Sequence, residues 1–271
     1  MGAAAALAVA GFSGTPAQIG CAALAGAAFT AAIRMLTNDS PAALTGAGLA
    51  ALLAIGLVLE QHHPTATTWL ALAAAGWTIA ELARTTRATP GVPALPATSP
   101  IVALLPAIVA ALLEPACAPL LVLAGVRMVT APWERPRWIV AVPIAGALGV
   151  SWYGAPAHPI SAAALAPAGA TAVGPLVAVA ALAGLALVIR ALHRGALAEL
   201  AILACTVGAL LGDLRAGSVG PMSLGLASLT AGLAVARLAA MIRIPSGQAV
   251  VGATCGMLLL VAPAYTALLA R

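Results

Sequence analysis

The chain has 271 residues, of which 63% are hydrophobic and only 7% are charged. A typical soluble domain has about 25% charged residues, so this composition leaves too few polar side chains to cover a water-facing surface. The twelve basic residues are all arginines, and they are scattered singly or in pairs along the chain. They do not form the basic stripe of a nucleic-acid-binding protein, and we expect no nucleic-acid partner.

The apolar residues fall into stretches that predict one helix after another. A transmembrane helix needs about 20 apolar residues, and several of these stretches are shorter. We therefore predict an all-α fold, a polytopic transmembrane helical bundle of about 8–10 spans with some short or re-entrant helices. The stretches are residues 17–36, 42–59, 65–83, 100–113, 116–130, 138–154, 171–190, 196–212, 221–242 and 247–270.

The arginines alternate with these stretches. When the connections are numbered in order, the even side carries only Arg215 and Arg271, and all the other arginines lie in or beside the odd connections. Basic loops of polytopic proteins stay in the cytoplasm, so we expect a multi-pass protein of the cell inner (cytoplasmic) membrane, surrounded by lipid bilayer. The arginines of the odd side are Arg34, Arg84, Arg87, Arg127, Arg135, Arg137, Arg190, Arg194, Arg237 and Arg243.

Two proline-rich linkers, Thr85–Ser99 and Ala155–Pro167, interrupt the helical pattern. We expect two parts of the chain: N-terminal transmembrane helices in residues 1–137 and C-terminal transmembrane helices in residues 138–271. The first residues, Met1–Gly11, are apolar but have no basic segment, so we expect no cleavable signal peptide.

Only Glu114 and Pro115 separate the stretches 100–113 and 116–130. These stretches could form two tilted short helices, a re-entrant pair or one long kinked span. We predict a hairpin, because a single span would place the Glu114 carboxylate in hydrocarbon.

The seven acidic residues are few enough to assess one by one. Glu81 lies three residues before Arg84, the spacing of an ion pair on one helix face. Carboxylates inside a membrane usually mark ion sites or proton relays. Glu199 lies one turn into its stretch and Glu114 at the end of one, so both are candidates for an intramembrane polar site. For Glu199 the sequence favours a structural ion pair over a proton relay.

No pattern indicates a metal, cofactor or catalytic site. His62 and His63 are adjacent, with His158 as the partner that a metal site would need, but no third ligand lies nearby in sequence. The cysteines occur singly in apolar stretches, where they behave as small hydrophobes. We therefore expect no metal, no cofactor and no enzyme activity. The cysteines are Cys21, Cys117, Cys205 and Cys255.

The chain from Asp213 to Pro221 has the composition of a tight turn between two helices. Asp213 follows an apolar stretch, Gly217 and Gly220 permit tight turning, and Pro221 suits the first turn of the next helix. A turn of this kind needs these residue types whatever the protein does.

Residues 138–271 resemble the rod-shape-determining membrane protein family MreD. In that family a short basic loop precedes an apolar helix, which ends in an Asp-Leu-x-x-Gly element followed by another glycine and a further helix. The resemblance implies a turn that also presents a surface to a partner protein. The residues at this element are Asp213, Leu214, Gly217, Ser218 and Gly220.

Two classes of function follow. The resemblance implies a non-catalytic integral membrane subunit or scaffold of a multiprotein complex, with other integral membrane proteins of the cell-shape and peptidoglycan synthesis (cell-wall elongation) machinery as partners. The alternative is a small-solute permease or the membrane substrate-binding subunit of a transporter, because glycine and proline in the spans permit broken helices. A membrane enzyme would need clustered acidic or histidine residues, which the sequence does not indicate.

Overall fold

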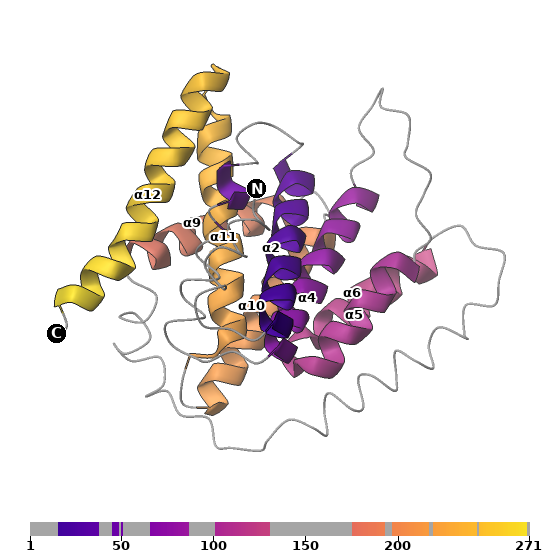
Figure 1. Cartoon of the computed structure of the whole chain (residues 1–271). Helices are drawn as coiled ribbons and strands as arrows, with labels where there is room; N and C mark the ends of the chain where they lie inside the picture. The colour runs from indigo at the N-terminus through magenta and orange to yellow at the C-terminus, as the bar shows by residue number, and fades with distance from the viewer. Residues whose placement is uncertain are drawn as a thin grey trace.

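A computed structural model describes residues 16–37, 45–48, 50, 66–86, 101–130, 175–192, 197–216, 219–242 and 244–269 (Figure 1). Within these ranges the chain is all-helical and has no strand, which confirms the all-α class. The predicted stretch 138–154, most of 42–59 and the boundary at residue 137 lie outside them. The elements are α2 (Pro16–Thr37), α4 (Ala66–Thr86), α5 (Ile101–Leu113), η1 (Pro115–Cys117), α6 (Ala118–Thr130), α9 (Pro175–Leu192), α10 (Leu197–Ala216), α11 (Pro221–Ala240) and α12 (Pro245–Leu269).

The ends of the helices follow from residue type. Several helices begin at a proline, whose fixed φ and missing N–H suit the first turn. At α11, Gly220 has an extended backbone (φ −88°, ψ 161°) and Pro221 opens the helix. Arginines occupy last turns, where a cation interacts favourably with the carbonyl end of the helix. These last-turn arginines are Arg34 in α2, Arg84 in α4, Arg127 in α6, Arg190 in α9 and Arg237 in α11.

The predicted hairpin is confirmed. Glu114 leaves the helical conformation (φ −142°, ψ 108°), and a single turn of 3₁₀-helix, η1, leads from it into α6. The Glu114 N–H donates to the Ala110 carbonyl, and the Cys117 N–H donates to the Glu114 carbonyl, both at 2.9 Å. Helices α5 and α6 then pack against each other. Each has 13 residues, or about 20 Å, which is shorter than the ~30 Å hydrocarbon core of a bilayer.

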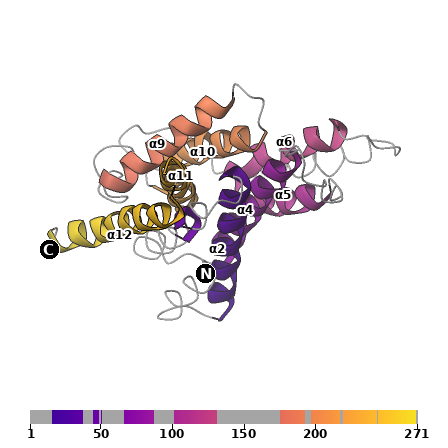
Figure 2. The same ribbon diagram turned by 90° about the horizontal axis from the view of Figure 1, so that it is seen from above.

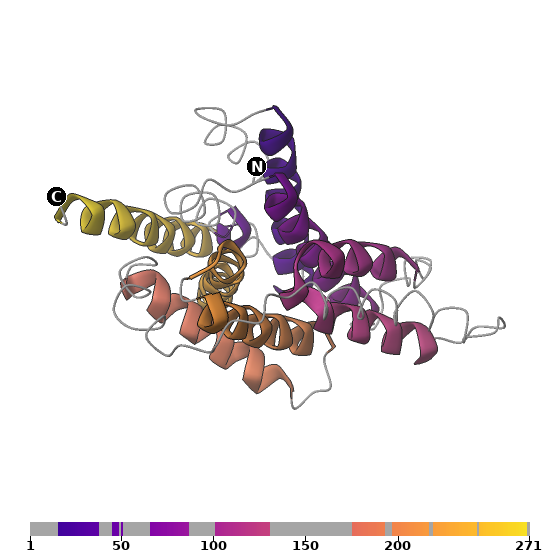
Figure 3. The ribbon, with the colours of Figure 1, turned by 90° about the horizontal axis from the view of Figure 1, so that it is seen from below.

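Two helix pairs form the centre of the fold. Helix α2 packs along α4, and α9 packs across α11, while α11 also contacts α2 and α4 (Figures 1 and 2). Helix α10 lies beside α9 and reaches α4, α6 and η1 (Figures 2 and 3). Helix α12 contacts α11 and α9 and projects away from the other helices (Figure 1). Of the helices described, α2 and α11 are long and apolar enough to cross a membrane, and α11 is also largely buried in the centre.

Small residues bring the helix backbones into close contact. A Cβ atom at Gly208 of α10 would lie 2.7 Å from the Ala116 carbonyl oxygen, and one at Gly232 of α11 would lie 2.5 Å from the Gly46 carbonyl oxygen. At Gly184 of α9 it would overlap the Thr230 carbonyl of α11. Because backbone atoms cannot move aside as a side-chain tip can, these glycines set the spacing of the helices.

Buried hydroxyl groups bond to their own helix. Thr78 and Ser228 are fully buried, and each donates to the carbonyl four residues earlier, Ala74 and Leu224, at 2.8 Å. This satisfies a polar group that has no water to bond. The interior therefore needs no ion or water at these two positions.

We expect Gly208→Ala and Gly232→Ala to destabilise the purified protein by about 1–3 kcal/mol each, the usual effect of overpacking a tight contact. The matched control is Gly20→Ala in α2, where a Cβ would meet nothing within 4 Å. Thermal unfolding in detergent measures all three. Equal melting temperatures for Gly208→Ala and Gly20→Ala would contradict the close packing of α10 against η1.

Candidate functional site

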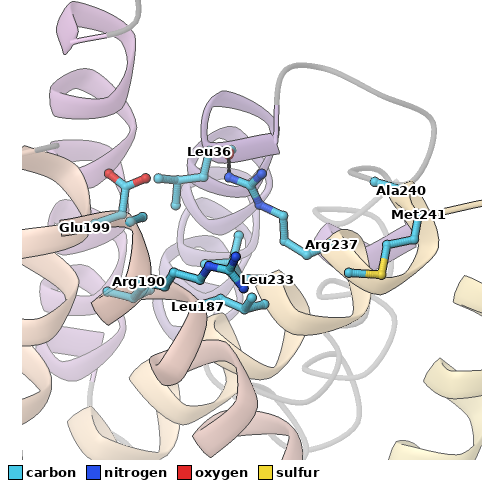
Figure 4. Close-up of a pocket in the computed structure, with 10 residues that line it drawn as sticks. Leu36, Leu187, Arg190, Glu199, Leu233, Arg237, Ala240 and Met241 are labelled. Atoms are coloured by element: carbon cyan, nitrogen blue, oxygen red, sulfur yellow. Dashed lines mark hydrogen bonds between the residues drawn. The ribbon is translucent and has the colours of Figure 1, made fainter. Parts of the chain in front are cut away.

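A cavity of about 400 Å³ lies where α2, α9 and α11 end and α10 begins (Figure 4). Its volume falls within the range of about 300–1,000 Å³ that is usual for ligand pockets. The lining is mostly aliphatic, with three charged side chains. The lining residues are Leu36, Leu187, Val188, Arg190, Ala191, Glu199, Leu233, Arg237, Ala240 and Met241.

The three charged residues reach the cavity from different helices. Glu199 lies in the first turn of α10 and is only 3% exposed. Arg190 comes from the last turn of α9 and Arg237 from the last turn of α11. Figure 4 shows both guanidinium groups on one side of Leu36 and the Glu199 carboxylate on the other. The cavity therefore has a cationic part and an anionic part.

The backbone of α2 holds Arg237 in place. The Arg237 Nη2 donates to the Leu36 carbonyl oxygen at 2.7 Å. This oxygen lies at the carbonyl end of α2, where a cation is favoured. A guanidinium has five N–H donors in a planar fork. The bond to Leu36 therefore fixes the orientation of the group and is compatible with its binding an anion as well.

The other end of α10 carries two carboxylates. Asp213 is 6% exposed, and its Oδ1 accepts a hydrogen bond of 2.8 Å from the Gly220 N–H at the start of α11. Glu114 lies nearby, in the turn before η1. Burial raises the pKa of the Glu114 carboxyl above its ordinary value, the Ala116 N–H lowers this pKa, and the charge of Asp213 raises it. An acidic cluster thus lies at the end of α10 away from the cavity.

The Asp213 turn differs in one respect from the sequence prediction. Asp213 was expected to follow the helix, but α10 continues to Ala216 and contains it. The residues after it, Leu214, Arg215 and Ala216, are good helix formers, so the helix gains another turn. Gly217 and Ser218 lie outside the described residues. The Asp213 carboxylate faces the turn and is buried. A contact of Asp213 with a partner protein stays a prediction.

The structure does not bring Glu199 and Glu114 together. Glu199 lies at the arginine end of α10, and Glu114 lies beside Asp213, about 20 Å further along that helix. The predicted pair of Glu81 with Arg84 is confirmed, with Nη2 and Oε2 2.8 Å apart. In the part of the chain that the structure describes, no group of three or more His, Cys, Asp and Glu side chains could hold a metal ion. The four histidines lie outside it.

Sequence reasoning missed the cavity. The sequence places Arg190 and Arg237 on the cytoplasmic side but does not indicate that they line a common cavity. Helix α9 crosses α11, with Gly184 against the Thr230 carbonyl (Figures 1 and 2), and residues beyond this crossing in both helices line the cavity. No local sequence signal joins these two arginines, because their common position at the cavity depends on that long-range packing.

Comparisons with protein families, with curated proteins and with solved structures found no match to this chain. The functional argument therefore depends on the residues and their geometry.

Asp213→Ala removes the acceptor of the Gly220 N–H, and we expect it to lower stability by about 1–3 kcal/mol, the range for a buried hydrogen bond to a charged group. Asp213→Asn keeps the oxygen acceptor and should lower the stability by less than half as much as Asp213→Ala. Thermal unfolding of both variants in detergent measures the difference. If Asn were as damaging as Ala, the charge and not the acceptor would stabilise the turn.

Proposed function

We propose that this chain is a multi-pass integral membrane protein of the inner membrane and a non-catalytic subunit of a multiprotein membrane complex. The observation that carries the proposal is the aliphatic exterior of its helices. Val179 and Leu182 of α9 are 64% and 66% exposed, and Val250 and Met257 of α12 are 63% and 70% exposed. Soluble monomers rarely expose contiguous apolar surface of this kind, whereas lipid would cover it at no cost.

The charges at the two ends of the bundle support one orientation. Arg34, Arg190 and Arg237 lie near the end formed by the last turns of α2, α9 and α11. Glu114 and Asp213 lie at the other end of α10. Arginine-rich connections stay in the cytoplasm, so we assign the arginine end to the cytoplasmic side.

Two observations favour a binding subunit. The Asp213–Gly220 element resembles the turn of the MreD family, which implies partners in the cell-shape and peptidoglycan synthesis machinery. Helix α12 contacts α11 and α9, and its Gly252 lies against Thr45, but it leaves Val250, Met257 and Leu258 exposed. A membrane protein partner packing along α12 would cover that face by the same close contacts that join the other helices.

A second candidate function is transport of a small solute. The cavity with Arg190, Glu199 and Arg237 favours it, because charged side chains within a membrane protein commonly mark substrate and ion pathways. The two functions differ in what they need: a subunit needs a partner on its surface, and a permease needs only its cavity.

The experiment is affinity purification in mild detergent, with wild type compared with two variants. Val250→Trp with Met257→Trp enlarges the outer face of α12, and Val179→Trp with Leu182→Trp makes the matched change on α9. We expect a co-purifying membrane protein whose recovery falls at least fivefold in the α12 variant and less than twofold in the α9 variant.

Two results would contradict the subunit proposal. One is extraction of the chain from membranes by alkaline carbonate without detergent, which would refute integration into the bilayer. The other is a wild-type protein that purifies without a partner and takes up a solute when reconstituted alone, which would favour the permease.

A further inference from the structure

We propose that the cavity at the arginine end binds an aminoethyl phosphate group, an ammonium and a phosphate joined by a short carbon chain. Two sources carry this chemistry, the headgroup of phosphatidylethanolamine and free O-phosphoethanolamine. The lipid source rests on the proposed membrane location; the binding chemistry rests on the cavity alone.

The two arginines supply the phosphate-binding part. Guanidinium groups match the oxygens of a phosphate in planar, bidentate hydrogen bonds. Arg237 is oriented by its bond to the Leu36 carbonyl, and Arg190 reaches the same side of the cavity from α9 (Figure 4). One arginine is thus fixed in place, whereas Arg190 is exposed and is available to a ligand that enters from the surface.

Glu199 supplies the ammonium-binding part. It is buried at the start of α10 and lines the cavity on the far side of Leu36 from the guanidinium groups. A carboxylate there repels a second phosphate and attracts a cation. The cavity therefore matches a ligand with opposite charges at its two ends better than it matches a simple anion.

The remaining lining fits the apolar parts of such a ligand. Leu187 and Leu233 lie along the cavity and can contact the carbon chain between the two charges. At the mouth, Met241 is 75% exposed. Ile189, Leu238 and Ile244 are also exposed on α9, at the end of α11 and just before α12. An apolar surface beside a charged cavity suits a lipid whose headgroup enters while its acyl chains stay outside, so we favour the lipid source.

The test measures binding of defined probes to the purified full chain in detergent, by native mass spectrometry and by thermal shift. The probes are short-chain phosphatidylethanolamine, short-chain phosphatidylglycerol, O-phosphoethanolamine, ethanolamine and inorganic phosphate. We expect the ethanolamine lipid to bind at least tenfold more tightly than the glycerol lipid. Inorganic phosphate and ethanolamine alone should bind weakly. Tighter binding of O-phosphoethanolamine than of the lipid would identify the free compound as the ligand and overturn the preference for lipid.

Three variants assign the residues. Arg190→Gln should weaken binding of the ethanolamine lipid at least tenfold, and it is chosen because Arg237→Gln also removes a bond to α2. Glu199→Gln should reduce the preference for the ethanolamine lipid over the glycerol lipid to less than twofold. Arg127→Gln, also in a last turn but outside the cavity lining, is the matched control and should bind like wild type.

Other outcomes would overturn the proposal. Equal binding of the two lipids by the wild type would remove the role of Glu199, and a similar loss in Arg127→Gln would show unspecific attraction to cationic helix ends. Folding of each variant is checked by its melting temperature without probe. None of these results bears on membrane integration, which carbonate extraction tests separately.

Discussion

Close backbone contact at small residues is the constraint on which the rest of this structure depends. Gly184 lies against the Thr230 carbonyl, and Gly232 lies against the Gly46 carbonyl, so α11 is held in register with its neighbours. In that register α2, α9 and α11 end together. Their last turns carry arginines, and the space between them, closed by the first turn of α10, is the cavity. Close packing at glycines thus positions the charged side chains that line the cavity.

The helices could largely be predicted from the sequence. Apolar stretches marked α2 and α11 to within two residues at each end, and Glu114-Pro115 predicted the reversal between α5 and α6. These features are local: proline opens a helix, arginine favours its end, and a carboxylate disfavours the middle of a span. The apolar stretch 196–212 ends just before Asp213 and so predicts a helix that ends there, yet α10 continues to Ala216.

The candidate site could be predicted only in part. Glu199 was singled out because a carboxylate in an apolar stretch is costly without a partner or a role. Leu36 and Arg237, which line the same cavity, are far away in the sequence, and only the packing of the helices against one another brings them to it. The same packing separates Glu199 from Glu114, which composition alone had grouped with it. The arginines and the carboxylates are scattered in the sequence. In the structure, Arg190 and Arg237 lie at one end of α10, and Glu114 and Asp213 lie at the other.

The orientation of α10 tests the central claim most directly, because the chain should pass through a membrane between its arginine end and its acidic end. Fusions of green fluorescent protein and of alkaline phosphatase are made after Leu192, which precedes α10, and after Ala216, which ends it. The account predicts fluorescence without phosphatase activity at Leu192, and phosphatase activity without fluorescence at Ala216. If both positions reported the same side, α10 would not cross the membrane and the proposed orientation would be wrong.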